Sequence, residues 1–189
     1  MWRLCMVTAL LSLSVTAVAE GLDYSYVQAS YSQVEFDEID VDGDGFGISG
    51  SFALTDRFAV FGGYQMADFD FDVESDTVEL GGLFHAPISD TVDLVTSLSY
   101  VSVEFDVPGI GSFDDDGFGV GVGLRAMASP QLELNGGVSY VDLNDSGDDT
   151  TFGAGIRYYF TESFSAGLGG SWGDDASSYG LSGRISFGN

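Results

Sequence analysis

Strict alternation of apolar and polar residues runs through most of the chain after residue 20. It is clearest in residues 117–128, where Phe118, Val120 and Val122 alternate with glycines. A period of two is typical of a β-strand with one apolar face. No apolar period of 3.6 residues follows residue 20, so the sequence predicts an all-β fold.

The alternation divides the chain into ten predicted strands. Most are 10 to 13 residues long, which exceeds the usual globular strand and suits a tilted strand that spans a membrane. Eight strands remain an alternative, if two of the less regular segments do not span. The ten segments are 22–34, 45–54, 58–69, 76–86, 92–105, 117–128, 132–143, 150–160, 164–173 and 178–187.

The connections between these segments alternate in kind. A short turn follows every second strand, and the remaining connections are acidic and mostly longer. An up-and-down transmembrane barrel has this arrangement, with short turns in the periplasm and longer loops outside the cell. The turns are 55–57, 87–91, 129–131 and 161–163, and the acidic loops are 35–44, 70–75, 106–116, 144–149 and 174–177.

A soluble β-sandwich is the alternative architecture, because it also alternates. Its outward face would be polar, and its inward face apolar and bulky. Here the polar face is rich in glycine and serine, which suit the confined interior of a small barrel. The apolar face carries aromatics suited to the membrane interfaces, and we therefore predict a closed antiparallel transmembrane β-barrel. These aromatics are Phe46, Phe58, Phe118, Tyr140, Phe152, Tyr158, Phe160, Trp172 and Phe187.

The pattern resembles the small outer-membrane β-barrels of Gram-negative bacteria, the OmpA-like and opacity-like barrels. The last strand is the most specific part, since Tyr179, Leu181, Ile185 and Phe187 resemble the C-terminal signal read by the barrel-assembly machinery. In that family the chain often stops at the aromatic residue, whereas here two residues follow. The resemblance implies an outer-membrane location, with membrane lipids and the assembly machinery as partners.

Residues 1–19 have the pattern of a secretory signal peptide. Arg3 precedes an apolar stretch, and Ala17-Val18-Ala19 forms a small-x-small cleavage site. An N-terminal anchor is the alternative, but the apolar stretch is short for a spanning helix. We expect a barrel domain over residues 20–189.

The chain is strongly acidic, with a net charge of −25 at pH 7. Of its 30 acidic residues, 22 lie in the five acidic loops or in the strand ends beside them. Such a surface repels nucleic acid and attracts divalent cations. We therefore expect cations, and no nucleic acid, among the partners.

A second set of charges falls on the glycine-rich face and points into the lumen. Counting across the turns places Arg125 opposite Asn135 and diagonal to Glu133, and His85 near Asp93. Buried charges require partners, so we predict a salt-bridged network in the periplasmic half. It forms either a structural plug or the constriction of a narrow pore. Its members are Glu79, His85, Asp93, Arg125, Glu133, Arg157 and Arg184.

Residues 36–47 contain half of a calcium-loop pattern, with Asp40, Asp42 and Asp44 at alternating positions before Gly45. The position that needs a bidentate glutamate falls on Ser51, so no complete EF-hand is present. We expect a hairpin tip that turns at Gly43 and Gly45 and whose carboxylates bind Ca²⁺ or Mg²⁺ loosely. No other cofactor is expected.

Catalysis is the less favoured function. His85 and Asp93 could polarise a serine, but no serine is singled out by its spacing. We expect a non-enzymatic barrel that is structural or forms a narrow porin-like passage for ions and small solutes. The alternative is a surface adhesin or cation-binding barrel that acts through its acidic loops.

Overall fold

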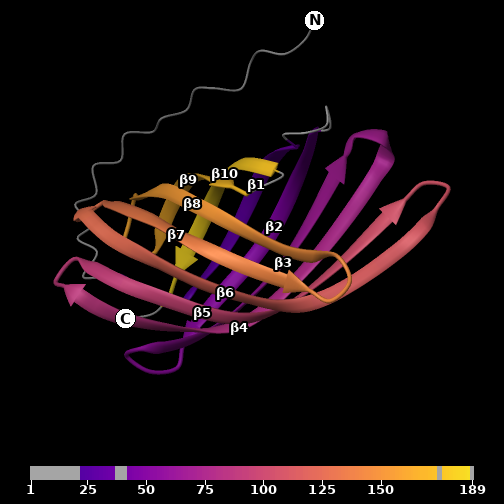
Figure 1. The fold of residues 1–189 in the computed structure, drawn as a ribbon. Coiled ribbons are helices and arrows are strands. Elements are labelled where there is room, and N and C mark those ends of the chain that lie inside the picture. Colours follow the sequence, from indigo (N-terminus) through magenta and orange to yellow (C-terminus); the bar gives the residue numbers. More distant parts are fainter. Residues whose placement is uncertain (1–21, 37–41, 174–175, 188–189) are drawn as a thin grey trace, which may run out of the picture.

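The computed structural model describes residues 22–36, 42–173 and 176–187. In these residues ten antiparallel strands follow one another around a closed barrel, and β1 completes it by pairing with β10 (Figure 1). The predicted ten-stranded up-and-down meander is confirmed. The strands are β1 (Tyr26–Phe36), β2 (Asp42–Ala53), β3 (Phe58–Phe69), β4 (Val73–Ser89), β5 (Val92–Val107), β6 (Gly111–Ser129), β7 (Leu132–Leu143), β8 (Gly147–Tyr159), β9 (Phe164–Trp172) and β10 (Ala176–Ser186).

The two ends of the barrel differ. The connections after β2, β4, β6 and β8 leave the barrel at one end, here called the turn end, where β1 begins and β10 finishes. The β3–β4, β5–β6 and β7–β8 connections lie at the opposite end, here called the hairpin end. Strands β5 and β6 have 16 and 19 residues, against 9 for β9. Their hairpin therefore projects beyond the neighbouring wall (Figure 1).

Three of the predicted acidic loops, 70–75, 106–116 and 144–149, are shorter in the structure than the sequence indicated. Of residues 106–116, only 108–110 lie outside the β5–β6 ladder, and residues 73–75 and 147–149 belong to strands. These segments stay extended because antiparallel pairing satisfies their backbone groups whether or not the side chains are charged.

Gly43 and Gly45 do not form a turn, which corrects the predicted hairpin tip. They lie within β2, where they pair with Val34 and Ser32 of β1. Asp42 and Asp44 are also strand residues, and Asp40 lies outside the described residues.

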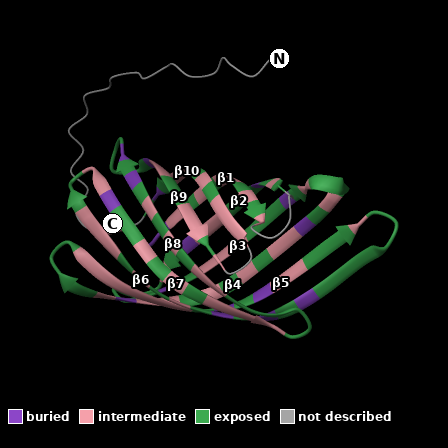
Figure 2. Cartoon of the chain, turned by 45° about the horizontal axis from the view of Figure 1, so that its top comes forward, coloured by how far each residue is buried: buried purple, intermediate pink, exposed green. Residues whose placement is uncertain are grey.

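Burial is reversed relative to a soluble protein. Among the described residues only five hydrophobic side chains are buried, against ten that are polar or charged. Large apolar residues remain on the outer face, such as Phe152 and Ile185 at 60% exposure, and exposure alternates along the strands (Figure 2). No helix in the described part of the chain is long and apolar enough to cross a membrane.

The polarity of the two faces changes towards the hairpin end. On β6 the outward residues are Phe118 and Val120 in the barrel wall but Asp114 and Asp116 beyond it. On the inward face the glycines give way to Phe113, which pairs with Phe105. Since carboxylates do not face hydrocarbon, this change marks the upper limit of the apolar belt.

Candidate functional site

The turn-end half of the lumen holds six of the seven predicted lumen charges. His85, Asp93, Arg125, Glu133, Arg157 and Arg184 all lie within a few residues of a turn-end connection or of the last residue of β10, on the inward face of their strands. Glu79 is six residues from His85 along β4, a distance of about 20 Å at the rise of an extended strand. It therefore lies higher in the lumen, and it makes no hydrogen bond or ion pair to another described residue.

Arg125 and Glu133 form a two-pronged ion pair. Arg125 Nε donates to Glu133 Oε1 over 2.8 Å and Nη2 donates to Oε2 over 3.0 Å. The Tyr159 hydroxyl donates to the same Oε2 over 2.6 Å. Glu133 is 1% exposed, so this fork is a charge-assisted contact removed from water.

Tyr24, in the segment before β1, fills much of the turn end. Its ring stacks on His85 with centroids 3.7 Å apart, and its hydroxyl donates to Asp93 Oδ2 over 2.8 Å. The Arg125 guanidinium lies 4.6 Å from the centre of the same ring and donates to the carbonyl oxygen of Asp23 over 3.0 Å. Tyr24 is 4% exposed, so the N-terminal segment is held inside the barrel mouth.

His85 and Asp93 are close but not hydrogen-bonded. His85 Nδ1 lies 3.4 Å from Asp93 Oδ2 without the geometry of a hydrogen bond. No serine hydroxyl within the described residues donates to His85. The arrangement therefore lacks the nucleophile–base contact of a hydrolytic triad.

Arg157 and Arg184 lie at the turn end in β8 and β10. Both donate to the same neutral acceptor, Gln28 Oε1, over 2.7 Å and 3.1 Å. Neither has a carboxylate oxygen within 4.0 Å among the described residues. The seven charges thus form an ion pair, a close His–Asp pair, two unpaired arginines and a separate glutamate, and not one continuous network.

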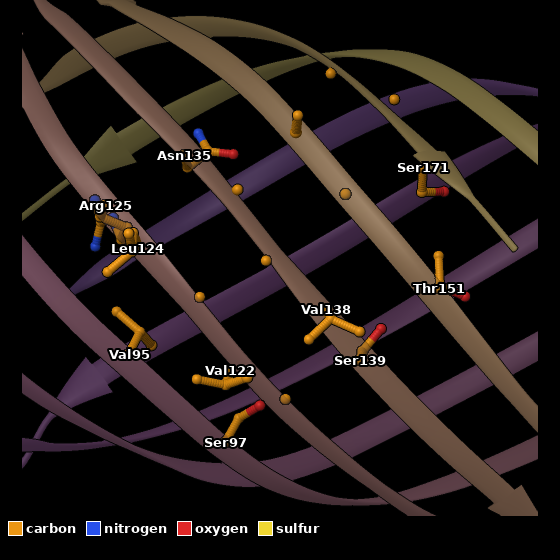
Figure 3. Close-up of a pocket in the computed structure, with 18 residues that line it drawn as sticks. Val95, Ser97, Val122, Leu124, Arg125, Asn135, Val138, Ser139, Thr151 and Ser171 are labelled. Carbon is orange, nitrogen blue, oxygen red and sulfur yellow. The ribbon is translucent and has the colours of Figure 1, made fainter.

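The lumen above this floor is hollow. A cavity of about 440 Å³ lies against β5 to β9, and a second of about 360 Å³ lies against the floor. They share Val95, Arg125, Asn135 and Gly169, and Figure 3 shows Arg125 and Asn135 on the wall of the upper cavity.

Glycine keeps this part of the wall thin. A Cβ on Gly137 would lie 2.6 Å from the carbonyl oxygen of Val122, and one on its cross-strand partner Gly123 would lie 2.8 Å from that of Gly136. Any side chain would push β6 and β7 apart, so this ladder requires glycine at both positions.

Asp115 fastens the β7–β8 turn at the hairpin end, beyond the apolar belt. Its carboxylate accepts from the backbone N–H groups of Asp145, Ser146 and Asp116. A side-chain hydrogen bond from Ser146, together with these amides, holds the pKa of Asp115 below its usual value against the opposing effect of burial.

Of the candidate calcium ligands, the structure describes Asp42 and Asp44. Asp42 and Asp44 are two residues apart on the outward face of β2, and Asp44 is the cross-strand partner of Asp68. No group of three acidic, histidine or cysteine residues within the described ranges is arranged to hold a metal ion.

The predicted assembly signal lies on the closing strand. Tyr179, Leu181 and Ile185 are on the outward face of β10, from 49% to 60% exposed. Phe187 follows the strand, and its N–H donates to the carbonyl oxygen of Ser25 over 3.0 Å.

Sequence reasoning did not find Tyr24, Gln28 or Tyr159. Gln28 and Tyr159 sit at inward positions of alternating segments, and this parity is the one signal that could have identified them. Tyr24 has the same parity as Gln28 within the predicted segment 22–34, although the strand itself begins at Tyr26.

Comparison with known proteins gives one family and a set of structural neighbours. The family model described as "Outer membrane protein beta-barrel domain" matches residues 5–160. A search of the curated proteins finds no significant match.

Several solved structures of bacterial proteins are also similar to this chain. An outer membrane channel from Pseudomonas putida F1 has 9% identity and a TM-score of 0.56, covering 93% of this chain and 100% of its own. The translocator domain of autotransporter NalP from Neisseria meningitidis has 10% identity and a TM-score of 0.50, over 88% and 89%. Neisserial surface protein A has 14% identity and a TM-score of 0.46, over 87% and 96%. At these identities the likeness concerns the fold.

Proposed function

This chain belongs to the outer membrane β-barrel family, and on that premise we propose that it is a non-enzymatic barrel that forms a narrow passage for ions and small solutes. Its location is the outer membrane of a Gram-negative bacterium. In such barrels the short turns face the periplasm, so we assign the turn end to that side. We also propose that residues 1–19 are a cleaved leader, and that Tyr179, Leu181, Ile185 and Phe187 are read during assembly.

One observation supports the proposed passage most strongly: the lumen is hollow and is lined by glycine and serine. In a small barrel large side chains fill the interior. Here the cavities of about 440 Å³ and 360 Å³ share part of their lining, and Asn135 remains exposed within the wall. Tyr24 and the Arg125–Glu133 pair narrow the periplasmic end. The geometry favours a small, restricted conductance.

Conductance of the refolded barrel in a planar bilayer tests this proposal. We expect discrete small steps from the chain without residues 1–19, and larger steps from Tyr24→Ala, which removes a ring from the narrow end. Tyr64→Ala is the matched control, because Tyr64 lies on the outward face at 40% exposure and should leave the steps unchanged.

A correctly folded barrel that conducts no current would contradict the passage and leave a structural role. Folding is checked independently by the heat-dependent shift of the barrel in gel electrophoresis. Equal conductance in wild type and Tyr24→Ala would show that Tyr24 does not limit the passage.

A surface-interaction role is the second proposal. It is supported by the outward carboxylates of the projecting hairpins, such as Asp114 and Asp116, and by the exposed tip residues Phe71 and Ile110 at 80% and 72%. Electrical silence together with binding of the purified barrel to cells would favour it. Calorimetric titration with calcium tests whether Asp42, Asp44 and the neighbouring carboxylates bind cations, and the absence of heat would remove that part.

A further inference from the structure

Arg157 and Arg184 form a cationic pair without an anion. Arg157 Nη1 donates to the Ser165 hydroxyl over 3.2 Å, and Nη2 donates to Gln28 Oε1 over 2.7 Å and to the Ser182 hydroxyl over 3.0 Å. Arg184 Nε donates to the same Gln28 oxygen over 3.1 Å. Among the residues that the structure describes, every acceptor that either guanidinium reaches is therefore neutral.

Glu133 forms no ion pair with either of these arginines. It is the cross-strand partner of Arg157, but its carboxylate is turned towards Arg125 and Tyr159, which occupy both oxygens. The Arg125–Glu133 pair is internally neutral, so no carboxylate of the described residues is in direct contact with the positive charges of Arg157 and Arg184.

Both guanidiniums also have unused donors. Arg157 Nε and Arg184 Nη1 are buried and have no hydrogen-bond partner in the described part of the chain. Arg157 as a whole is 5% exposed. A buried charge is costly unless it is paired and fully hydrogen-bonded, and the environment here supplies neither.

The two arginines line the lower cavity, of about 360 Å³, which we call the arginine chamber. Tyr26, Gln28, Asn135 and Ser182 contribute polar atoms to its wall. The Tyr26 ring lies 3.7 Å from the Arg184 guanidinium carbon and holds that side chain in place. The volume is large enough for a small ion and its hydrating water.

We propose that the arginine chamber is a binding site for a small oxyanion, either a carboxylate or inorganic phosphate. Planar guanidiniums recognise both groups through paired N–H···O contacts. An oxyanion between Arg157 and Arg184 supplies the missing negative charge. After small side-chain shifts it also accepts hydrogen bonds from the unused N–H groups of the two guanidiniums. The site is defined by equilibrium binding, and it does not depend on whether solutes cross the barrel.

Arginine side-chain NMR provides a direct test. The chain without residues 1–19 has four arginines, namely Arg57, Arg125, Arg157 and Arg184, so its ¹⁵Nε spectrum is simple. The refolded barrel is titrated in micelles with inorganic phosphate and, separately, with acetate, at constant ionic strength with chloride as the balancing anion. We expect saturable shifts of the Arg157 and Arg184 signals with at least one of them, while the signal of Arg57, in an exposed turn, stays in place.

The variant Gln28→Glu places a carboxylate where both arginines already donate. It keeps the size of the side chain and should weaken anion binding by about tenfold or more, as loss of a charge-assisted contact does. Gln65→Glu is the matched control, because Gln65 also faces the lumen but lies on β3, across from Thr77. It introduces the same charge and should leave binding within about twofold of wild type.

Arg184→Gln gives a second variant should Gln28→Glu fail to fold, and it should weaken binding to a similar extent. The proposal is overturned if neither phosphate nor acetate shifts the two signals saturably. It is equally overturned if a folded Gln28→Glu or Arg184→Gln barrel binds the anion as tightly as wild type.

Discussion

Replacing Glu133 by glutamine should destabilise the barrel by removing one charge from a buried pair. The side chains of Arg125 and Glu133 are 13% and 2% exposed, and breaking such a pair from one side costs about 3–5 kcal/mol. Arg125 keeps the Asp23 carbonyl, and the new amide oxygen can still accept from Tyr159. We therefore expect the lower end of the range, about 3 kcal/mol.

Reversible urea unfolding measures this loss, and the chain contains its own probe. Without residues 1–19 its one tryptophan is Trp172, which faces outward from β9 at 42% exposure, so its fluorescence reports insertion. Glu162→Gln, in an exposed turn, is the control and should change the free energy of unfolding by less than about 0.5 kcal/mol.

The double variant Arg125→Met/Glu133→Leu separates charge from packing. A well-packed apolar pair can replace a buried ion pair, so the double variant should be more stable than Glu133→Gln by at least about 1 kcal/mol. If Glu133→Gln falls within about 0.5 kcal/mol of wild type, then water reaches the pair and the argument from burial is refuted.

Three further outcomes follow from contacts already described. Tyr24→Phe should lower the free energy of unfolding by about 1.5–3 kcal/mol, because it removes only the hydrogen bond to a carboxylate; an unchanged urea midpoint would contradict this. Gly137→Ala should cost about 1–3 kcal/mol from overpacking, whereas Gly183→Ala, whose added methyl meets nothing within 4 Å, should be neutral in the same assay. The pKa of Asp115 is lowered in the folded barrel. The hydrogen bonds of its carboxylate to the β7–β8 turn are therefore fully present above the ordinary aspartate pKa of about 3.9. They are lost as the pH falls through the lower pKa of the folded state. The NMR signals of the turn amides should therefore titrate below that ordinary pKa in wild type and in Asp114→Asn, and the transition should vanish in Asp115→Asn.

The fold could be predicted because its main signal is local. Alternation in a stretch such as 117–128 fixes which residues face outward, and the short turns fix which strands are neighbours. The ends of β5 and β6 could not be predicted in the same way. Three consecutive aspartates, Asp114 to Asp116, conceal the alternation that Phe105 and Phe113 continue on the inward face, so a strand resembles a loop.

At the floor of the lumen, too, local contacts could be predicted from the sequence and long-range contacts could not. The Arg125–Glu133 contact could be found by counting, because a tight turn sets the register of β6 against β7. The contacts of Gln28 with Arg157 and Arg184 could not, since 129 and 156 residues separate the partners. Tyr24 has the inward parity of the predicted segment 22–34, but its contacts with His85, Asp93 and Arg125 join distant strands, and no local pattern in the sequence indicates them.

Those long separations bear on the order of folding. Gln28 belongs to the first strand, Arg184 to the last, and Arg125 reaches Asp23 across 102 residues. We expect these contacts to form only when β1 meets β10, because closing so large a loop costs conformational entropy before the contacts contribute any stabilising free energy. Until that moment the arginines of β6, β8 and β10 stay solvated on an open sheet. Closure then desolvates them and forms their hydrogen bonds to Gln28 and to the Asp23 carbonyl oxygen together. The polar floor is therefore completed last, and a barrel that has not closed gains little stability from it.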